Sequence, residues 1–205
     1  MASLMTLPAA AALPAAPDAQ KRAHTVTAPH GAARADEYYW LRDDARTNAD
    51  VIGYLNAENA YADALLAPLG PLQEALYAEI VGRIKQDDAS VPYLDDGYWY
   101  YTRFEAGKDY PIHARRQGSM EAPEQVLLDL NPMAEGKGYF SVGDMAVSPD
   151  NRLLAWAEDG VGRRQYTLRF KDLATGTVLE DVIEGASPNV VWADDNKTLF
   201  YVEND

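Results

Sequence analysis

The sequence predicts a mainly β protein, a partial β-propeller preceded by an N-terminal arm and a helical hairpin. After Ser90, short runs rich in Tyr, Trp, Val and Leu alternate with turn residues, which is typical of antiparallel strands. A motif that begins at Asp150 recurs 45 residues later at Asp195. A period in the forties with short strands is typical of propeller blades. Before Ser90 the apolar residues instead follow a helical period.

The composition excludes several classes of protein. The chain has 205 residues, with 32 acidic and 18 basic side chains and a formal net charge of −14. A protein this acidic lacks the basic surface that nucleic acids require, so we expect no nucleic acid partner. No apolar run of about 18 residues is present, so we expect no membrane association through a spanning helix. The sequence has no cysteine and only three scattered histidines, so we expect no disulfide, no metal and no cofactor.

Residues 1–22 are rich in Ala and Pro, and we expect them to form a disordered leader. A secretory signal is the alternative, but a signal needs a positively charged start and an unbroken apolar run. Here Pro8, Pro14 and Pro17 interrupt the apolar run, and no basic residue precedes Lys21. The sequence therefore favours a cytoplasmic location over a periplasmic or secreted one.

Residues 23–86 are expected to form an N-terminal arm followed by the helical hairpin. Apolar residues recur at spacings of three and four from Ala49 to about Gln86, which is the pattern of amphipathic helices. Gly70-Pro71 interrupts this pattern, and Pro71 suits the first turn of a second helix. Two helices alone cannot bury both of their apolar stripes, so the hairpin must pack against another part of the protein.

Residues 87–205 are expected to form the first blades of the propeller. The predicted strands span residues 98–104, 112–117, 125–129, 153–158, 165–171, 178–182, 190–193 and 198–203. The segments that begin at Asp150 and Asp195 align with each other, and a weaker copy begins at Asp96. These strands make about two and a half blades, whereas a closed propeller has at least four. An open array of blades would expose an unpaired edge strand, so we expect this chain to be the N-terminal part of a longer protein.

Three groups of motifs are more specific than composition. The first group is Val26-Thr27-Ala28-Pro29-His30-Gly31 with Arg34, Asp36 and Tyr38-Tyr39-Trp40-Leu41-Arg42-Asp43-Asp44. The second group is Tyr98-Trp99-Tyr100-Tyr101-Thr102-Arg103 with Tyr110-Pro111-Ile112-His113-Ala114-Arg115-Arg116. The third group is Val147-Ser148-Pro149-Asp150, Leu153-Leu154-Ala155-Trp156 and Val191-Trp192-Ala193-Asp194-Asp195. The first group resembles the opening of the prolyl oligopeptidase family, and the other two resemble its oligopeptidase B branch. The resemblance extends from about Lys21 to the last residue.

The resemblance implies a function and two partners. The family are serine peptidases that cut short peptides, and the oligopeptidase B branch cuts after Lys or Arg. It also implies a seven-bladed propeller that restricts access to the active site. The N-terminal helices would pack on a C-terminal α/β-hydrolase domain that is missing from this chain. The expected partners are therefore short basic peptides, as substrates of the full-length protein, and the missing hydrolase domain.

The catalytic residues of such a peptidase are not found in this chain. A hydrolase of this type needs a serine in a Gly-x-Ser-x-Gly elbow or a close variant, followed by Asp and His. The serines that lack this frame are Ser3, Ser90, Ser119, Ser141, Ser148 and Ser187. We therefore assign no catalytic residue to the sequence, and the substrate-binding residues remain unknown. The 205-residue chain should be inactive alone.

Other candidate residues have simpler structural interpretations. The pairs Asp87-Asp88, Asp95-Asp96 and Asp194-Asp195 could act as acid and base, but turn contexts favour backbone hydrogen bonding. His30 suits a local hydrogen bond, and His113 suits a packing position in a blade. The pairs Arg115-Arg116 and Arg163-Arg164 are expected to be solvated, with salt bridges to other blades or to the missing domain as the alternative. The aromatic residues 98–101 could line a ligand site, although core packing is the commoner role.

Two functions remain open. The first is the N-terminal part of an oligopeptidase B-like serine peptidase, which the motifs and the blades favour. The second is a non-enzymatic binding or scaffold protein built from propeller blades, which the absence of a catalytic triad favours.

Sequencing the source gene beyond codon 205 separates these two functions. We expect further repeats of about 45 residues, then a Gly-x-Ser-x-Gly elbow with later Asp and His residues. A genuine stop codon directly after Asp205 would contradict the peptidase interpretation and leave the scaffold protein.

Overall fold

The computed structural model describes residues 14–203. It divides into two compact units, with the boundary between Ile84 and Lys85. Across the described residues, no helix is both long and apolar enough to cross a membrane.

The first unit begins with an extended segment and a small hairpin that the sequence did not predict. Strands β1 (Thr25–Thr27) and β2 (Ala33–Ala35) pair in antiparallel fashion around a turn. Gly31 adopts a φ of 86° in this turn, a conformation that favours glycine. Of the predicted leader, residues 1–13 lie outside the described residues. Residues 14–22 form no helix or strand, but the carbonyl of Gln20 accepts a 2.7 Å hydrogen bond from the Trp40 indole.

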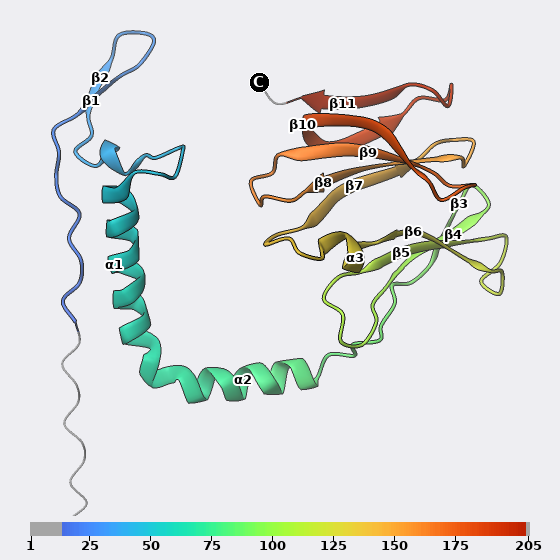
Figure 1. Ribbon diagram of the computed structural model, residues 1–205, viewed down its shortest axis with the longest axis horizontal. Helices are drawn as coiled ribbons and strands as arrows, with labels where there is room; N and C mark the ends of the chain where they lie inside the picture. Colours follow the sequence, from blue (N-terminus) through green and yellow to red (C-terminus); the bar gives the residue numbers. More distant parts are fainter. Residues whose placement is uncertain (1–13, 204–205) are drawn as a thin grey trace, which may run out of the picture. The chain divides into compact units, whose positions relative to one another are not determined.

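Two helices follow the short 3-10 turn η1 (Tyr39–Leu41), as the sequence predicts (Figure 1). Helix α1 (Ala49–Leu66) and helix α2 (Gly70–Gly82) are joined by the short turn η2 (Ala67–Leu69). The side chain of Asn48 caps α1 by accepting a hydrogen bond from the backbone N–H of Asp50 at 3.0 Å. The helix break at Gly70 is where the sequence places it, because Pro71 fits the first turn of α2.

The apolar stripes of the helices are exposed in the first unit. Within α1 and α2 only Val51 is buried. The exposed apolar residues of this segment are Ile52, Leu55, Leu66, Leu69, Leu72, Leu76, Tyr77, Ile80 and Ile84. The unit therefore does not cover these stripes itself, as the hydrophobic pattern predicts.

The second unit begins with a four-stranded antiparallel sheet, here called the first blade. Its strands run in sequence order from β3 (Tyr93–Asp95) through β4 (Tyr98–Arg103) and β5 (Ile112–Gln117) to β6 (Glu124–Asp129). The short helix α3 (Leu130–Ala134) follows directly. The predictions for β4, β5 and β6 are confirmed to within one residue, whereas β3 was missed because it is only three residues long.

A five-stranded sheet follows, and Figure 1 shows its strands stacked in the order of the chain. It comprises β7 (Ser141–Val147), β8 (Leu153–Asp159), β9 (Tyr166–Asp172), β10 (Val178–Trp192) and β11 (Leu199–Glu203). The sequence did not predict β7. It predicted two separate strands, 178–182 and 190–193, where the structure has the single strand β10.

The length of β10 has a physical reason, since it belongs to two blades. Residues 178–186 pair with β9, and residues 186–192 pair with β11. Gly185 adopts a φ of 73°, and register shifts flank Ala186, so the strand bends between its two halves. The first half completes the second blade (β7–β9 and residues 178–186), and the second half opens a third. About two and a half blades are therefore present, as predicted.

The repeat found in the sequence corresponds to a repeated hairpin. The turns that join β3 to β4, β7 to β8, and β10 to β11 contain Asp96, Asn151 and Asn196. These three residues adopt φ values of 43°, 62° and 59°, a left-handed conformation that Asp and Asn tolerate better than most residues. The 45-residue offset therefore separates the first hairpins of the second and third blades, whereas 55 residues separate Asp96 from Asn151.

Two apolar clusters form the core of the second unit. The larger lies between the first and second blades and contains Leu127, Leu128, Leu130, Ala134, Phe140, Leu154, Trp156 and Leu173. The smaller joins the second blade to the far half of β10 and contains Ala157, Leu168, Ala186 and Val190. Each blade thus buries a face against the next one, which is how stacked repeats gain stability.

Gly143 allows β7 to approach β10 closely. A Cβ placed at this position would lie 2.6 Å from Cβ of Pro188 and 2.6 Å from the ring of Tyr166. No real Cβ tolerates such contacts, so the site requires glycine.

We predict that Gly143→Ala destabilises the protein by about 1–3 kcal/mol, because the added methyl overpacks this crossing. Gly138→Ala is the matched control, since nothing lies within 4 Å of its Cβ position. Thermal unfolding of both variants measures the difference, and equal unfolding temperatures would show that the β7–β10 crossing is not tightly packed.

Candidate functional site

The seam between the first and second blades is built around the guanidinium of Arg115. Its side chain points from β5 toward the second blade and is only 1% exposed. Nη1 donates to Oδ1 of Asn151 at 2.7 Å and to the hydroxyl of Tyr100 at 3.0 Å. Nη2 donates to the carbonyl of Asn151 at 3.0 Å, and Nε donates to Oε1 of Gln125 at 2.7 Å. The guanidinium therefore bonds to neutral acceptors from both blades.

Further hydrogen bonds strengthen this seam. The amide of Gln125, which holds Arg115, donates to the carbonyl of Leu173 in the second blade at 2.7 Å. Lys171 of β9 donates to the carbonyl of Leu127 in β6 at 2.8 Å. Burial lowers the pKa of Lys171, because partial removal from water disfavours the charged ammonium.

The turns of successive blades are also bonded to one another. The amide of Asn151 donates to the carboxylate of Asp96 in the preceding blade. In the same way, Oδ1 of Asn196 accepts a 2.7 Å hydrogen bond from the backbone N–H of Asp150. These bonds place the β3–β4, β7–β8 and β10–β11 turns at the same end of the unit.

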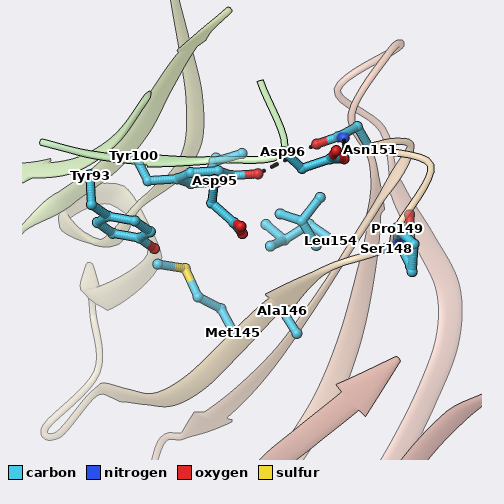
Figure 2. Close-up of a pocket in the computed structure, with 12 residues that line it drawn as sticks. Tyr93, Asp95, Asp96, Tyr100, Met145, Ala146, Ser148, Pro149, Asn151 and Leu154 are labelled. Atoms are coloured by element: carbon cyan, nitrogen blue, oxygen red, sulfur yellow. Dashed lines mark hydrogen bonds between the residues drawn. The ribbon is translucent and has the colours of Figure 1, made fainter. Parts of the chain in front are cut away.

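A pocket opens at this end of the seam, between β3 and β4 on one side and β7 with its following turn on the other (Figure 2). We call it the inter-blade pocket. Its volume is about 290 Å³, and it is lined by Tyr93, Asp95, Asp96, Tyr100, Leu127, Met145, Ala146, Val147, Ser148, Pro149, Asn151 and Leu154. Both walls come from described residues of the same unit.

The pocket is acidic and aromatic. Two carboxylates, those of Asp95 and Asp96, line it, and no basic side chain does. The rings of Tyr93 and Tyr100 stack with their centroids 5.5 Å apart. Partial desolvation raises the pKa of both tyrosines, and the charge of Asp95 acts in the same direction. At Tyr100 the guanidinium of Arg115 opposes this rise in pKa.

None of the described serines forms a nucleophile elbow. Ser148 is buried in the β7–β8 turn, where its hydroxyl donates to Asp150 at 2.6 Å and accepts from the backbone N–H of Leu153 at 2.9 Å. Ser90 and Ser119 accept hydrogen bonds from backbone N–H groups, and Ser141 lies at the start of β7. Ser3 lies outside the described residues. The structure therefore gives no reason to assign a nucleophile here.

Among the acidic pairs at the described blade turns, Asp195 makes the backbone hydrogen bonds that its turn context predicts. Asp195 accepts from the backbone N–H groups of Lys197 and Thr198 and from the Thr198 hydroxyl. The Thr198 hydroxyl and these N–H groups lower the pKa of Asp195 to about 2. Asp95 ends β3 and Asp96 lies in the β3–β4 turn, and both line the inter-blade pocket.

No histidine lines the inter-blade pocket. His113 is half-buried in β5, with Nδ1 3.1 Å from the hydroxyl oxygen of Thr102, and burial lowers its pKa. This agrees with the predicted packing role. His30 is exposed beside the Gly31 turn. Among residues 14–203, no group of three or more His, Asp or Glu side chains could hold a metal ion.

The expectation of solvated arginines is wrong for Arg115-Arg116. Arg115 is buried in the seam, and Arg116 donates to the hydroxyl of Tyr101 and to the carbonyl of Ala122. Sequence reasoning missed these contacts because the partners of Arg115 in the second blade lie 36 residues away along the chain. Arg163 and Arg164, in contrast, are exposed and make no ion pair with another described residue.

The comparison with known families agrees with this architecture. A family model described as "Prolyl oligopeptidase, N-terminal beta-propeller domain" matches residues 17–205. The chain belongs to the prolyl oligopeptidase family. The family assignment confirms the resemblance inferred from the sequence motifs, and it places the blades described above in the N-terminal propeller of a serine peptidase family.

Individual members of the prolyl oligopeptidase family match this chain closely. It is 57% identical to dipeptidyl aminopeptidase BI of Pseudoxanthomonas mexicana, over 98% of this chain and 30% of the relative. It is 37% identical to Protease 2 of Moraxella lacunata, over 86% of this chain and 26% of the relative. The structure of oligopeptidase B from Leishmania major is 34% identical, with a TM-score of 0.85 over 93% of this chain and 29% of that protein. The chain spans less than a third of the length of these relatives.

We predict that Arg115→Lys destabilises this propeller unit by about 2–4 kcal/mol. A lysine keeps the buried charge, but its single ammonium group cannot reach all four acceptors of the guanidinium. Buried oxygens of Asn151 and Gln125 would then lack hydrogen-bond donors, and the buried charge would lack acceptors. Thermal unfolding measures the effect, and Arg163→Lys on the exposed β8–β9 loop is the control. A change below about 0.5 kcal/mol in Arg115→Lys would show that the seam does not depend on the guanidinium.

Proposed function

We propose that this chain is the N-terminal part of a serine oligopeptidase that hydrolyses short peptides. The observation that carries the proposal is the family match over residues 17–205. Its curated relatives bear the names of a dipeptidyl aminopeptidase and of a protease. The sequence itself has no nucleophile elbow, so in this proposal the catalytic triad belongs to the part of the relatives that the chain does not cover.

The two units of the chain have separate roles in this proposal. The helices α1 and α2 dock their exposed apolar stripes on a C-terminal α/β-hydrolase domain, which covers residues such as Leu72, Leu76 and Ile80. The blades form part of a closed propeller that restricts access of peptides to the active site. A propeller with a narrow central channel admits short, extended chains and excludes folded proteins.

Cleavage after Lys or Arg is the proposed specificity. The net charge of −14 favours the approach of cationic peptides. The 34% identity to an oligopeptidase B over 93% of the chain supports the same branch of the family. We also propose a cytoplasmic location, which is supported by the interrupted, uncharged start of the sequence.

Release of dipeptides from a free N-terminus is a second candidate activity. The observation that favours it is the 57% identity to a protein named dipeptidyl aminopeptidase BI. The two activities differ in one requirement, since a dipeptidyl aminopeptidase needs a free α-amino group two residues before the cleaved bond. A scaffold of propeller blades without enzymatic activity is the remaining alternative.

The complete protein encoded by the source gene should be assayed with paired fluorogenic dipeptides. Each pair has Arg, Lys, norleucine or Glu before the cleaved bond, and the N-terminus is either free or acetylated. We expect the Arg and Lys substrates to exceed the norleucine substrate by at least about 100-fold in kcat/KM, since buried charge pairing is worth several kcal/mol.

The outcomes distinguish the candidates. Cleavage of the acetylated Arg substrate supports an endopeptidase, whereas activity confined to free N-termini supports release of dipeptides. Equal cleavage of the Arg and norleucine substrates would contradict the basic specificity. A fluorophosphonate reacts with active serines. If no substrate is cleaved and the fluorophosphonate labels no serine, the protein is not a serine peptidase and the non-enzymatic scaffold is favoured.

A further inference from the structure

We propose that the inter-blade pocket binds the guanidinium or ammonium group of an Arg or Lys side chain in a peptide. The proposal rests on the proposed function, because it assumes that peptides reach the propeller. It concerns a binding site formed by residues of the first two blades.

The charge of the pocket favours a cation. Asp95 and Asp96 are its charged lining residues, and Asp96 already accepts a hydrogen bond from Asn151. Asp95 is exposed at the mouth of the pocket, and its carboxylate makes no hydrogen bond or ion pair with any described residue. Figure 2 shows it directed into the space between Tyr93, Met145 and Leu154. A carboxylate at the wall of a pocket without a partner is well suited to a charge-assisted hydrogen bond with an entering cation.

The aromatic wall favours the same ligand. Tyr93 and Tyr100 stack against each other and both line the pocket, and Met145 lies opposite them. The face of a neutral tyrosine ring attracts a cation, and the thioether of methionine packs well against an alkyl chain. A long side chain that carries a cation at its end therefore matches both the wall and the carboxylate.

Arg115, the basic residue that contacts Tyr100, does not neutralise the carboxylate of Asp95. The guanidinium carbon of Arg115 lies over the ring of Tyr98, 3.9 Å from its centroid, and Arg115 does not line the pocket. Its donors are engaged by Asn151, Tyr100 and Gln125. Because these bonds hold Arg115 within the seam, the charge of Asp95 stays available to a ligand.

The position of the pocket makes it accessible to a peptide. It lies at the turn end of β3 and β7, which are the first strands of their blades. In a propeller the blades surround a central channel, and the first strand of each blade lines it. A peptide that passes along the channel would therefore meet the pocket, and a volume of about 290 Å³ can hold an arginine side chain.

The test uses the complete protein after its active serine has been blocked with a fluorophosphonate. The probe is the peptide acetyl-Ala-Ala-Arg-Ala-Ala-amide, and the uncharged comparison has citrulline in place of Arg. Binding is measured by calorimetry for wild type, Asp95→Asn, Tyr93→Leu and Asp194→Asn. Asp194 is the matched control, since it occupies the equivalent β10–β11 turn and makes no hydrogen bond or ion pair with another described residue.

We expect Asp95→Asn to weaken binding of the Arg peptide about tenfold, which is the loss of one charge-assisted hydrogen bond. Tyr93→Leu should weaken it about threefold through the lost ring. Asp194→Asn should remain within about twofold, and the citrulline peptide should bind wild type as weakly as the Arg peptide binds Asp95→Asn.

Three results would overturn the proposal. The first is an affinity of Asp95→Asn for the Arg peptide that equals the affinity of wild type. The second is an equal loss of affinity in Asp194→Asn, which would show that the overall negative charge of the protein, and not the pocket, attracts the peptide. The third is binding of the citrulline peptide to wild type with the same affinity as the Arg peptide. Failure of the proposed function is visible separately, because a protein without peptidase activity does not react with the fluorophosphonate, whereas peptide binding can still be measured.

Discussion

The buried guanidinium of Arg115 is the constraint on which the arrangement of the first two blades depends. A charge removed from water must have its donors satisfied, and Arg115 finds no carboxylate within the seam. It finds instead the hydroxyl of Tyr100 and the amide of Gln125 in its own blade and two oxygens of Asn151 in the next. These bonds require that the two blades keep a fixed spacing and register. The apolar cluster around Leu154 and Trp156 then packs between sheets that are already aligned.

The inter-blade pocket is a consequence of the same constraint. Asn151 can present two oxygens to Arg115 because its backbone adopts the left-handed conformation in the β7–β8 turn. Its amide nitrogen then reaches Asp96, and the turn of the first blade is held beside that of the second. The side chains of Tyr93 and Asp95 remain on the open side of this contact. The bonds that join the blades thus also leave one carboxylate and an aromatic wall free for a ligand.

The sequence predicts the elements whose signals are local. The helix break at Gly70-Pro71 and the repeated turns at Asp150 and Asp195 depend on residues within a few positions of one another, and both are confirmed. The pairing of β10 with two blades could not be predicted, since it depends on partners 7 to 20 residues away on either side. Arg115 was misjudged for the same reason. A basic pair in an acidic chain suggests a solvated surface, and only the folded seam shows that one of the two is buried. Asp95, which the sequence suggested for a turn, is instead the last residue of β3. Its pocket also requires β7, a strand that the sequence did not indicate.

A double-mutant cycle between Arg115 and Asn151 tests the account most directly. Arg115→Met removes the guanidinium, and Asn151→Gly removes the amide while tolerating the left-handed backbone. If the two residues join the blades, the losses in unfolding free energy should fall short of additivity by at least about 1 kcal/mol. Additive losses, within about 0.3 kcal/mol, would contradict the claim that this contact fixes the seam.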